Sequence, residues 1–220
     1  MQHKQIGITE RDHSGAVHMK TLFCLFATLL AVVQVAAANA IYDVSIDTSS
    51  LEGTNSTLAF DFIDGGSPSN SIVVSHFPTD SSFGASSSIG SVSGTLGSTA
   101  TLTDGSFFNE LQQPVTLGTS LSFRLLASAN APLYGSLPDT FSFFILNPTA
   151  TESLVTTTDP TGANSLFAVQ IGATGNAVGV YGALAPSLLP VRVSPVPEPS
   201  TTMFLLFGIA AIWAIRMRKR

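Results

Sequence analysis

The chain has 220 residues, enough for one domain beside targeting segments, and only 10% of them are charged. Between Ile41 and Val196 there are 11 acidic residues against two arginines, a formal charge of −9, and no lysine, cysteine, methionine or tryptophan. This composition excludes thiol and disulfide chemistry from that stretch. It also disfavours nucleic-acid binding, because an acidic surface repels phosphates.

The N-terminal region has the three parts of an export signal. Lys20 supplies a positive start, Leu22–Val33 is an apolar run, and small side chains at Ala38 and Ala40 precede a cleavage point. The apolar run enters the translocon while the lysine stays inside, and the small residues fit the pockets of signal peptidase. Residues 1–40 are therefore predicted to form a signal peptide region, with the mature protein beginning at Ile41.

Two alternatives stay open for this region. The apolar run could be a retained membrane anchor, although it is shorter than the ~20 residues that a spanning helix needs. Residues 1–18 could be a long polar start of the signal, or they could precede the true initiator at Met19.

Short apolar runs alternate with Ser, Thr and Gly over residues 41–194. In Thr57–Ile63, for example, Leu58, Phe60 and Phe62 fall on one face, and turn-forming residues such as Asn147-Pro148 separate the runs. The pattern predicts an all-β ectodomain, an antiparallel β-sandwich that is jelly-roll-like. The expected strands are Ile41–Asp47, Thr57–Ile63, Ser71–Phe77, Ile89–Leu96, Ser120–Ala127, Thr140–Leu146, Ser165–Ile171 and Leu188–Val193.

The phenylalanines within these runs are expected to fill the space between two sheets. They are Phe60, Phe62, Phe123, Phe141, Phe143, Phe144 and Phe167. The alternative is an aromatic platform for carbohydrate. Such platforms usually expose Trp or Tyr, and this stretch holds only Tyr42, Tyr134 and Tyr181.

Groups suited to catalysis are few in this stretch. His76 is its one histidine, and no Gly-x-Ser-x-Gly segment is present, so we expect no catalytic residue, no metal and no other cofactor. Two alternatives remain. Asp61 and Asp64 could supply oxygen ligands to Ca²⁺, and a glycoside hydrolase could use two carboxylates, with Asp104 and Glu110 as further candidates.

The end of the chain has three parts in a fixed order. The motif Pro197-Glu198-Pro199 comes first, and its prolines oppose regular structure. The apolar run Thr201–Ile215 is predicted to form a short transmembrane helix. Basic residues then hold the C-terminus in the cytoplasm by the positive-inside rule. These basic residues are Arg216, Arg218, Lys219 and Arg220.

This ending, residues 195–220, resembles the PEP-CTERM sorting signal. The resemblance implies that an exosortase, a membrane-embedded transpeptidase-like protease, recognises Pro197, Glu198 and Pro199 and cuts near them. It also implies a Gram-negative host, often one that makes exopolysaccharide. The segments Thr48–Gly53 and Thr157–Gly162 are similar to turns of a recurrent PEP-CTERM ectodomain type, for which no activity is implied.

The sequence thus predicts a non-enzymatic exported protein of the cell surface or extracellular matrix, anchored transiently in the inner membrane. Its expected partners are signal peptidase and an exosortase-type protease, with exopolysaccharide as a further candidate and no nucleic acid. Three alternatives stay open. The tail could be an unprocessed anchor, the ectodomain could be a carbohydrate-binding module with a groove at Tyr134 or Tyr181, or it could be a carboxylate-dependent glycoside hydrolase.

Overall fold

The computed structural model describes residues 39–66, 69–128, 137–171, 176–185, 189–197 and 208. The chain divides into two units, Met1–Ala36 and Ala37–Arg220, and all described residues belong to the second. The predicted three-part division into residues 1–40, 41–194 and 195–220 stays a prediction.

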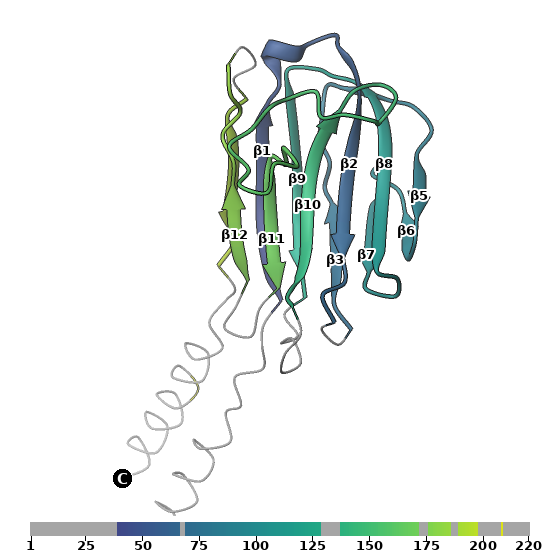
Figure 1. Ribbon diagram of the computed structural model, residues 1–220, viewed down its shortest axis with the longest axis vertical. Coiled ribbons are helices and arrows are strands. Elements are labelled where there is room, and N and C mark those ends of the chain that lie inside the picture. Colours follow the sequence, from purple (N-terminus) through teal and green to yellow (C-terminus); the bar gives the residue numbers. More distant parts are fainter. Residues whose placement is uncertain are drawn as a thin grey trace, which may run out of the picture. The chain divides into compact units, whose positions relative to one another are not determined.

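The second unit is built from two antiparallel sheets, which Figure 1 shows as two layers. Every strand pairing between its described strands is antiparallel, which confirms the predicted all-β, sandwich-like architecture. The finer comparison with a jelly roll stays a prediction.

Sheet A has six strands, and sheet B has seven. In order across sheet A they are β13 (Val191–Pro195), β1 (Ala40–Asp47), β9 (Ser120–Ala127), β3 (Ser71–Ser75), β7 (Thr99–Thr103) and β6 (Val92–Gly94). Across sheet B they are β12 (Ala177–Val180), β11 (Phe167–Ile171), β10 (Asp139–Leu146), β2 (Asn55–Ile63), β8 (Phe108–Thr116) and β4 (Ser82–Phe83), with β5 (Ser87–Ile89) also paired to β8. A 3₁₀ turn, η1 (Ser49–Leu51), follows β1.

The core lies between the sheets and is rich in phenylalanine. Alternate residues of β9 and β10 are buried, as a two-residue period requires. The rings of Phe60 and Phe143 have centroids 4.9 Å apart, and those of Phe123 and Phe143 are 5.4 Å apart. Six of the seven predicted core phenylalanines are buried. The prediction was wrong for Phe144, which follows Phe143 and therefore points to the outer face of sheet B, where it is half-buried.

Two expected strands end or divide at residues with positive φ. The run predicted as Ile89–Leu96 is interrupted at Gly90, whose φ is +74°, and a side chain there would clash with the Phe108 carbonyl. As a result β5 joins sheet B and β6 joins sheet A. Strand β3 stops at Ser75, two residues before the predicted end, because His76 has a φ of +48°.

Candidate functional site

The first and last strands of the sandwich, β1 and β13, lie side by side in sheet A. Strand β1 pairs on one side with β9 and on the other with β13, so Ala40 lies opposite Ala127 and Tyr42 lies opposite Pro195. The amide of Val196 donates a backbone hydrogen bond of 2.8 Å to the carbonyl oxygen of Ile41. The first and last strands of the domain are therefore held together up to Val196.

The residues predicted for processing fall at and beyond this point. Ala40 is the first residue of β1 and is partly buried, while Pro197 directly follows the last paired residue and is exposed. The other predicted processing residues lie outside the described residues. They are Ala38, Glu198, Pro199, Arg216, Arg218, Lys219 and Arg220.

A family model described as the PEP-CTERM protein-sorting motif matches residues 195–220. The chain carries a PEP-CTERM sorting motif. This motif implies export, association with the cell envelope and processing by an exosortase-type system. No curated protein and no solved structure matches the chain.

The PEP-CTERM motif begins where the sheet ends. Its first residue, Pro195, is also the last residue of β13, and the hydrogen bond of Val196 closes the sheet one residue later. Proline is tolerated here because β13 is an edge strand of sheet A and the Pro195 nitrogen needs no ladder partner. The folded domain thus leaves no spacer between its last hydrogen bond and Pro197.

The membrane prediction for the tail rests on sequence. The described residues contain no helix with the length and apolar character needed to cross a bilayer. The predicted transmembrane segment, residues 201–215, falls outside the described residues except for Gly208.

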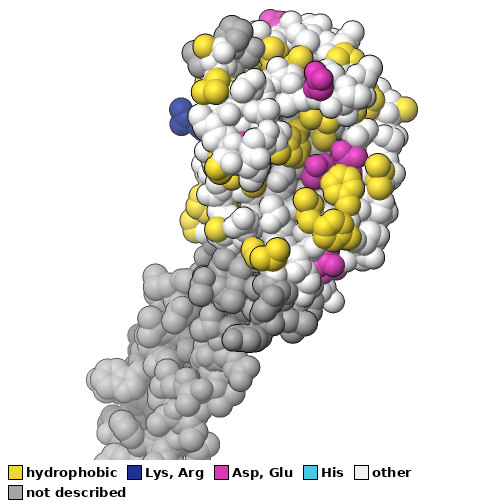
Figure 2. Space-filling view, viewed as in Figure 1, with side chains coloured by type: hydrophobic (Ala, Val, Ile, Leu, Met, Phe, Trp, Pro, Cys, Tyr) yellow, Lys and Arg dark blue, Asp and Glu magenta, His cyan; other side chains and the backbone are white. Residues whose placement is uncertain are grey.

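The outer face of sheet B brings two carboxyl groups together. Asp61 of β2 lies opposite Glu110 of β8, and Ser142 of β10 is its neighbour on the other side. Glu110 is only 7% exposed, and one carboxyl oxygen of Asp61 is buried with no hydrogen-bond partner. Figure 2 shows acidic side chains set among hydrophobic ones on the side of the molecule that Figure 1 presents.

The surroundings of this pair favour a protonated acid. Burial raises the pKa of Asp61 to about 7, and the charge of Glu110 and a hydrogen bond with it add to the effect. Neighbouring register positions on this face hold Ile89, beside Glu110, and Ile63, two residues beyond Asp61. Below about pH 7 Asp61 therefore keeps its proton, under partly apolar cover.

The sequence identified these acids but paired them differently. Asp64, expected beside Asp61, instead accepts a 2.6 Å hydrogen bond from the amide of Gly66 and shapes the turn after β2. Asp104 accepts a hydrogen bond from the amide of Asn70 and holds the turn before β3. Asp61 lies opposite Glu110 because β2 pairs with β8. The sequence around either residue does not predict that strand pairing.

The calcium alternative gains no ligand set from this arrangement. In the part of the chain that the structure describes, no group of three His, Cys, Asp or Glu side chains is placed to share a metal ion. Asp61 and Glu110 are a carboxyl pair that a hydrolase could use, since neighbouring carboxyl groups can act as acid and base. The hollows lined by described residues near Asp43, Asn55 and Ser75 contain neither of these two acids.

The carboxyl pair gives the fold a defined pH dependence. Because Asp61 keeps its proton in the fold up to about pH 7 and loses it near pH 4 when unfolded, stability should fall as pH rises through that window. We expect the free energy of unfolding in urea to drop by about 1–2 kcal/mol from pH 5 to pH 7, and Asp61→Asn to remove most of that drop.

Acids whose pKa is lowered in the fold do not titrate between pH 5 and pH 7. Hydrogen bonds from Thr119 hold the pKa of Asp80 at about 2, so its contribution is lost only in stronger acid. Glu152→Gln, which removes an exposed carboxyl, serves as the control. Its free energy of unfolding should fall with pH as steeply as that of wild type. If the free energy of unfolding falls equally with pH in wild type and in Asp61→Asn, Asp61 is not the source of the pH dependence.

Proposed function

We propose that the protein is a non-enzymatic component of the cell surface or extracellular matrix, delivered there through its PEP-CTERM motif by exosortase-type processing. The observation that carries the proposal is the motif at residues 195–220. It begins at the last residue of β13, the last described strand of the sandwich. Because β13 ends at Pro195 and Val196 makes the last hydrogen bond to β1 among the described residues, a cut near Pro197 would leave all of β13 in place.

The same geometry supports an order for the two proposed cleavages. The bond between Ala40 and Ile41 lies inside β1, where both residues pair with β9. A protease needs its substrate strand free, so signal peptidase would act before β1 enters the sheet. Exosortase-type cleavage near Pro197 needs no unfolding, because that residue is exposed and lies beyond the last sheet hydrogen bond.

The tail would hold the folded domain at the membrane between these two steps. The apolar run at residues 201–215 would anchor it in the inner membrane, and the four basic residues at 216–220 would keep the end in the cytoplasm. Since only a few residues separate Val196 from the apolar run, the sandwich would stay close to the bilayer, within reach of a membrane-embedded protease.

Replacing Glu198 tests this proposal in the native host. We expect wild-type protein to be recovered outside the inner membrane, in the outer envelope or the medium, and the Glu198→Ala protein to remain in the inner-membrane fraction. Glu152→Ala removes an exposed acid from the sandwich without touching the motif, and it should behave like wild type. If the Glu198→Ala protein leaves the membrane as wild type does, processing through the motif is wrong.

Saccharide binding is the second candidate function, and one feature of the structure favours it. The predicted groove at Tyr134 or Tyr181 is not the feature, since Tyr134 lies outside the described residues and Tyr181 packs beside Gly179 in sheet B. A hollow on the outer face of sheet A, lined by two arginines, an aspartate and three serines beside apolar side chains, supplies the argument instead.

A further inference from the structure

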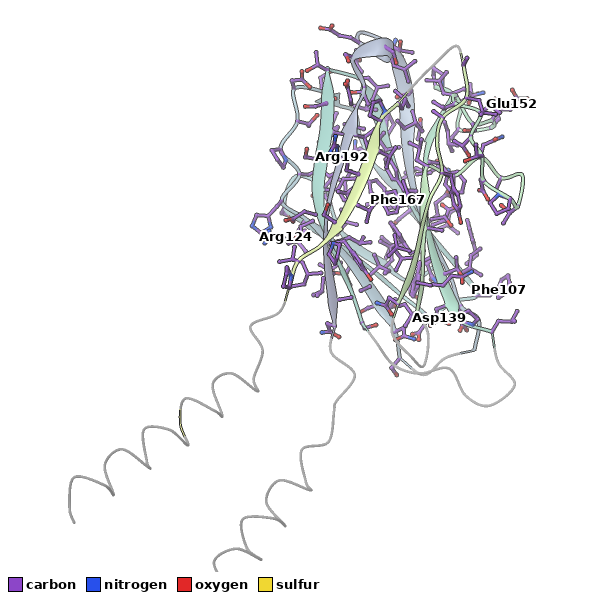
Figure 3. All side chains as sticks on the ribbon, turned by 90° about the vertical axis from the view of Figure 1, so that its left-hand side faces the viewer. Phe107, Arg124, Asp139, Glu152, Phe167 and Arg192 are labelled. Carbon is purple, nitrogen blue, oxygen red and sulfur yellow. The ribbon has the colours of Figure 1, made fainter. Side chains whose placement is uncertain are left out.

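The basic side chains of the ectodomain gather at one hollow on sheet A. Residues 41–196 contain two arginines, one histidine and no lysine. Arg124 on β9, Arg192 on β13 and His76, just after β3, all line this hollow, which has a volume of about 380 Å³. Figure 3 shows Arg124 and Arg192 on the same side of the sandwich, away from Phe107 and Glu152.

Strand register explains why these residues meet. Asp43 of β1 lies opposite Arg124 on one side and Ser194 on the other. One pair further along, Ser45 of β1 lies between Arg192 and Ser122. The outward positions of three neighbouring strands thus form two rows that combine guanidinium, carboxylate and hydroxyl groups.

Among the described residues, Arg192 is the cation of this hollow that has no partner. Arg124 donates from Nε to Oδ1 of Asp43 at 2.9 Å, while Arg192 has no ion pair or hydrogen bond to any other described residue. The side chains of Arg124 and Asp43 are 42% and 55% exposed, and so open a pair adds little to stability. Its effect is to orient the Arg124 guanidinium along the Asp43 carboxylate, in the hollow that Arg192 also lines.

The charge balance limits the ligand to one anionic group at a time. Arg124, Arg192 and Asp43 together carry a charge of +1, in a stretch whose formal charge is −9. A guanidinium fork binds a carboxylate through two parallel hydrogen bonds. A densely charged polyanion would be repelled by the rest of the domain, whereas a single carboxylate would be held.

The remaining polar groups of the hollow suit a ligand rich in hydroxyls. Ser45, Ser122 and Ser194 line it, and their hydroxyls make no hydrogen bond to any other described residue. Each hydroxyl can both donate and accept, and the Asp43 carboxylate accepts. His76 reaches the same hollow from a left-handed backbone position, at a φ of +48°.

We propose that this hollow binds a saccharide in which carboxylate-bearing sugar rings are spaced by neutral ones, with the fork of Arg192 holding one carboxylate and the serines and Asp43 holding ring hydroxyls. An acidic peptide fits less well, because it offers few hydroxyls and its closely spaced carboxylates would face Asp43. The proposal does not depend on the sorting function, since binding can be measured on protein that is never processed.

Calorimetric titration of the full chain in mild detergent tests the proposal. The probes are a hyaluronan tetrasaccharide, in which uronate and N-acetylglucosamine alternate, the neutral chitin tetrasaccharide, and a tetraglutamate peptide. We expect the hyaluronan tetrasaccharide to bind at least about tenfold more tightly than either other probe, as a charge-assisted bidentate hydrogen bond implies.

Two variants with the same change in net charge separate local from global effects. Arg192→Gln removes the free guanidinium and should weaken binding about tenfold or more. Gln170→Glu adds an acid at an exposed position of β11 in sheet B, and should change binding less than about twofold. Unchanged thermal unfolding of both exposed-site variants shows that the fold is kept.

Each result of the titrations either supports or overturns the proposed saccharide site. Preference for the uronate probe, lost in Arg192→Gln and kept in Gln170→Glu, supports the proposal. Equal binding of the neutral tetrasaccharide, equal losses in the two variants, or no binding of any probe overturns it. Tighter binding of tetraglutamate would assign the hollow to an acidic peptide and also overturns it. Each result is independent of whether Glu198→Ala blocks processing.

Discussion

Phe143→Ala should cost about 3–5 kcal/mol of the free energy of unfolding, because it removes a fully buried ring from the centre of the sandwich. The ring of Phe143 contacts those of Phe60, Phe123 and Phe167, with centroids 4.9, 5.4 and 5.7 Å away. These neighbours come from both sheets and cannot all collapse into the cavity. A domain of this size should lose roughly 6–20 °C in Tm, measured by circular dichroism.

Phe107→Ala is the matched control for this substitution. Phe107 has the same side chain but is 75% exposed, at the turn before β8. Its removal should change stability by no more than about 0.5 kcal/mol. If the two variants unfold at the same temperature, the phenylalanine core is wrongly placed.

The second large effect is expected at Asp139, a fully buried carboxylate at the start of β10. Its Oδ1 accepts a 2.7 Å hydrogen bond from the amide of Gly65, and its Oδ2 accepts one of 2.9 Å from Nδ2 of Asn70. These bonds fasten the loop between β2 and β3 to sheet B. Asp139→Ala leaves both donors without this acceptor and should destabilise the fold by about 2–4 kcal/mol in urea unfolding.

Asp139→Asn provides the comparison, because an amide keeps one acceptor oxygen in nearly the same shape. We expect it to cost less than Asp139→Ala, and the Gly65 amide to exchange faster in the alanine variant than in either other protein. A loss of under about 0.5 kcal/mol for Asp139→Ala would show that the loop is held by other contacts.

Local pattern in the sequence was enough to predict the sandwich and most of its strands. The run Ser120–Ala127 is β9 without change, and Thr140–Leu146 differs from β10 by one residue. Strand β8 was missed because its inward positions include Asn109 and Gln113, which break the apolar alternation. Both are satisfied inside the fold: Asn109 donates to the Phe62 carbonyl oxygen and Gln113 to that of Gly84.

Short strands were missed for a different reason. Strand β7 has only Ala100 and Leu102 as its buried apolar residues, and β12 is largely exposed. Neither carries enough apolar alternation to stand out from the surrounding Ser, Thr and Gly. Their place in the sheets is set by pairing with β3 and with β11, which no local window of sequence contains.

The sites show the same division between local and long-range information. The sorting motif is contiguous, so its residues and order are readable in the sequence. The Asp61–Glu110 pair and the Arg124–Arg192 hollow join residues far apart in the chain, and each exists only through strand register. The charged residues can be listed from the sequence, but strand pairing in the fold determines which of them are neighbours.

The most direct test of the central claim is the intact mass of the protein recovered from its native host. Processing through the PEP-CTERM motif predicts a species that begins at Ile41 and ends near Pro197, retaining β1 and β13 as a pair. The Glu198→Ala protein should instead keep its tail. A wild-type mass that includes residues through Arg220 would contradict the account and leave the tail as a simple anchor.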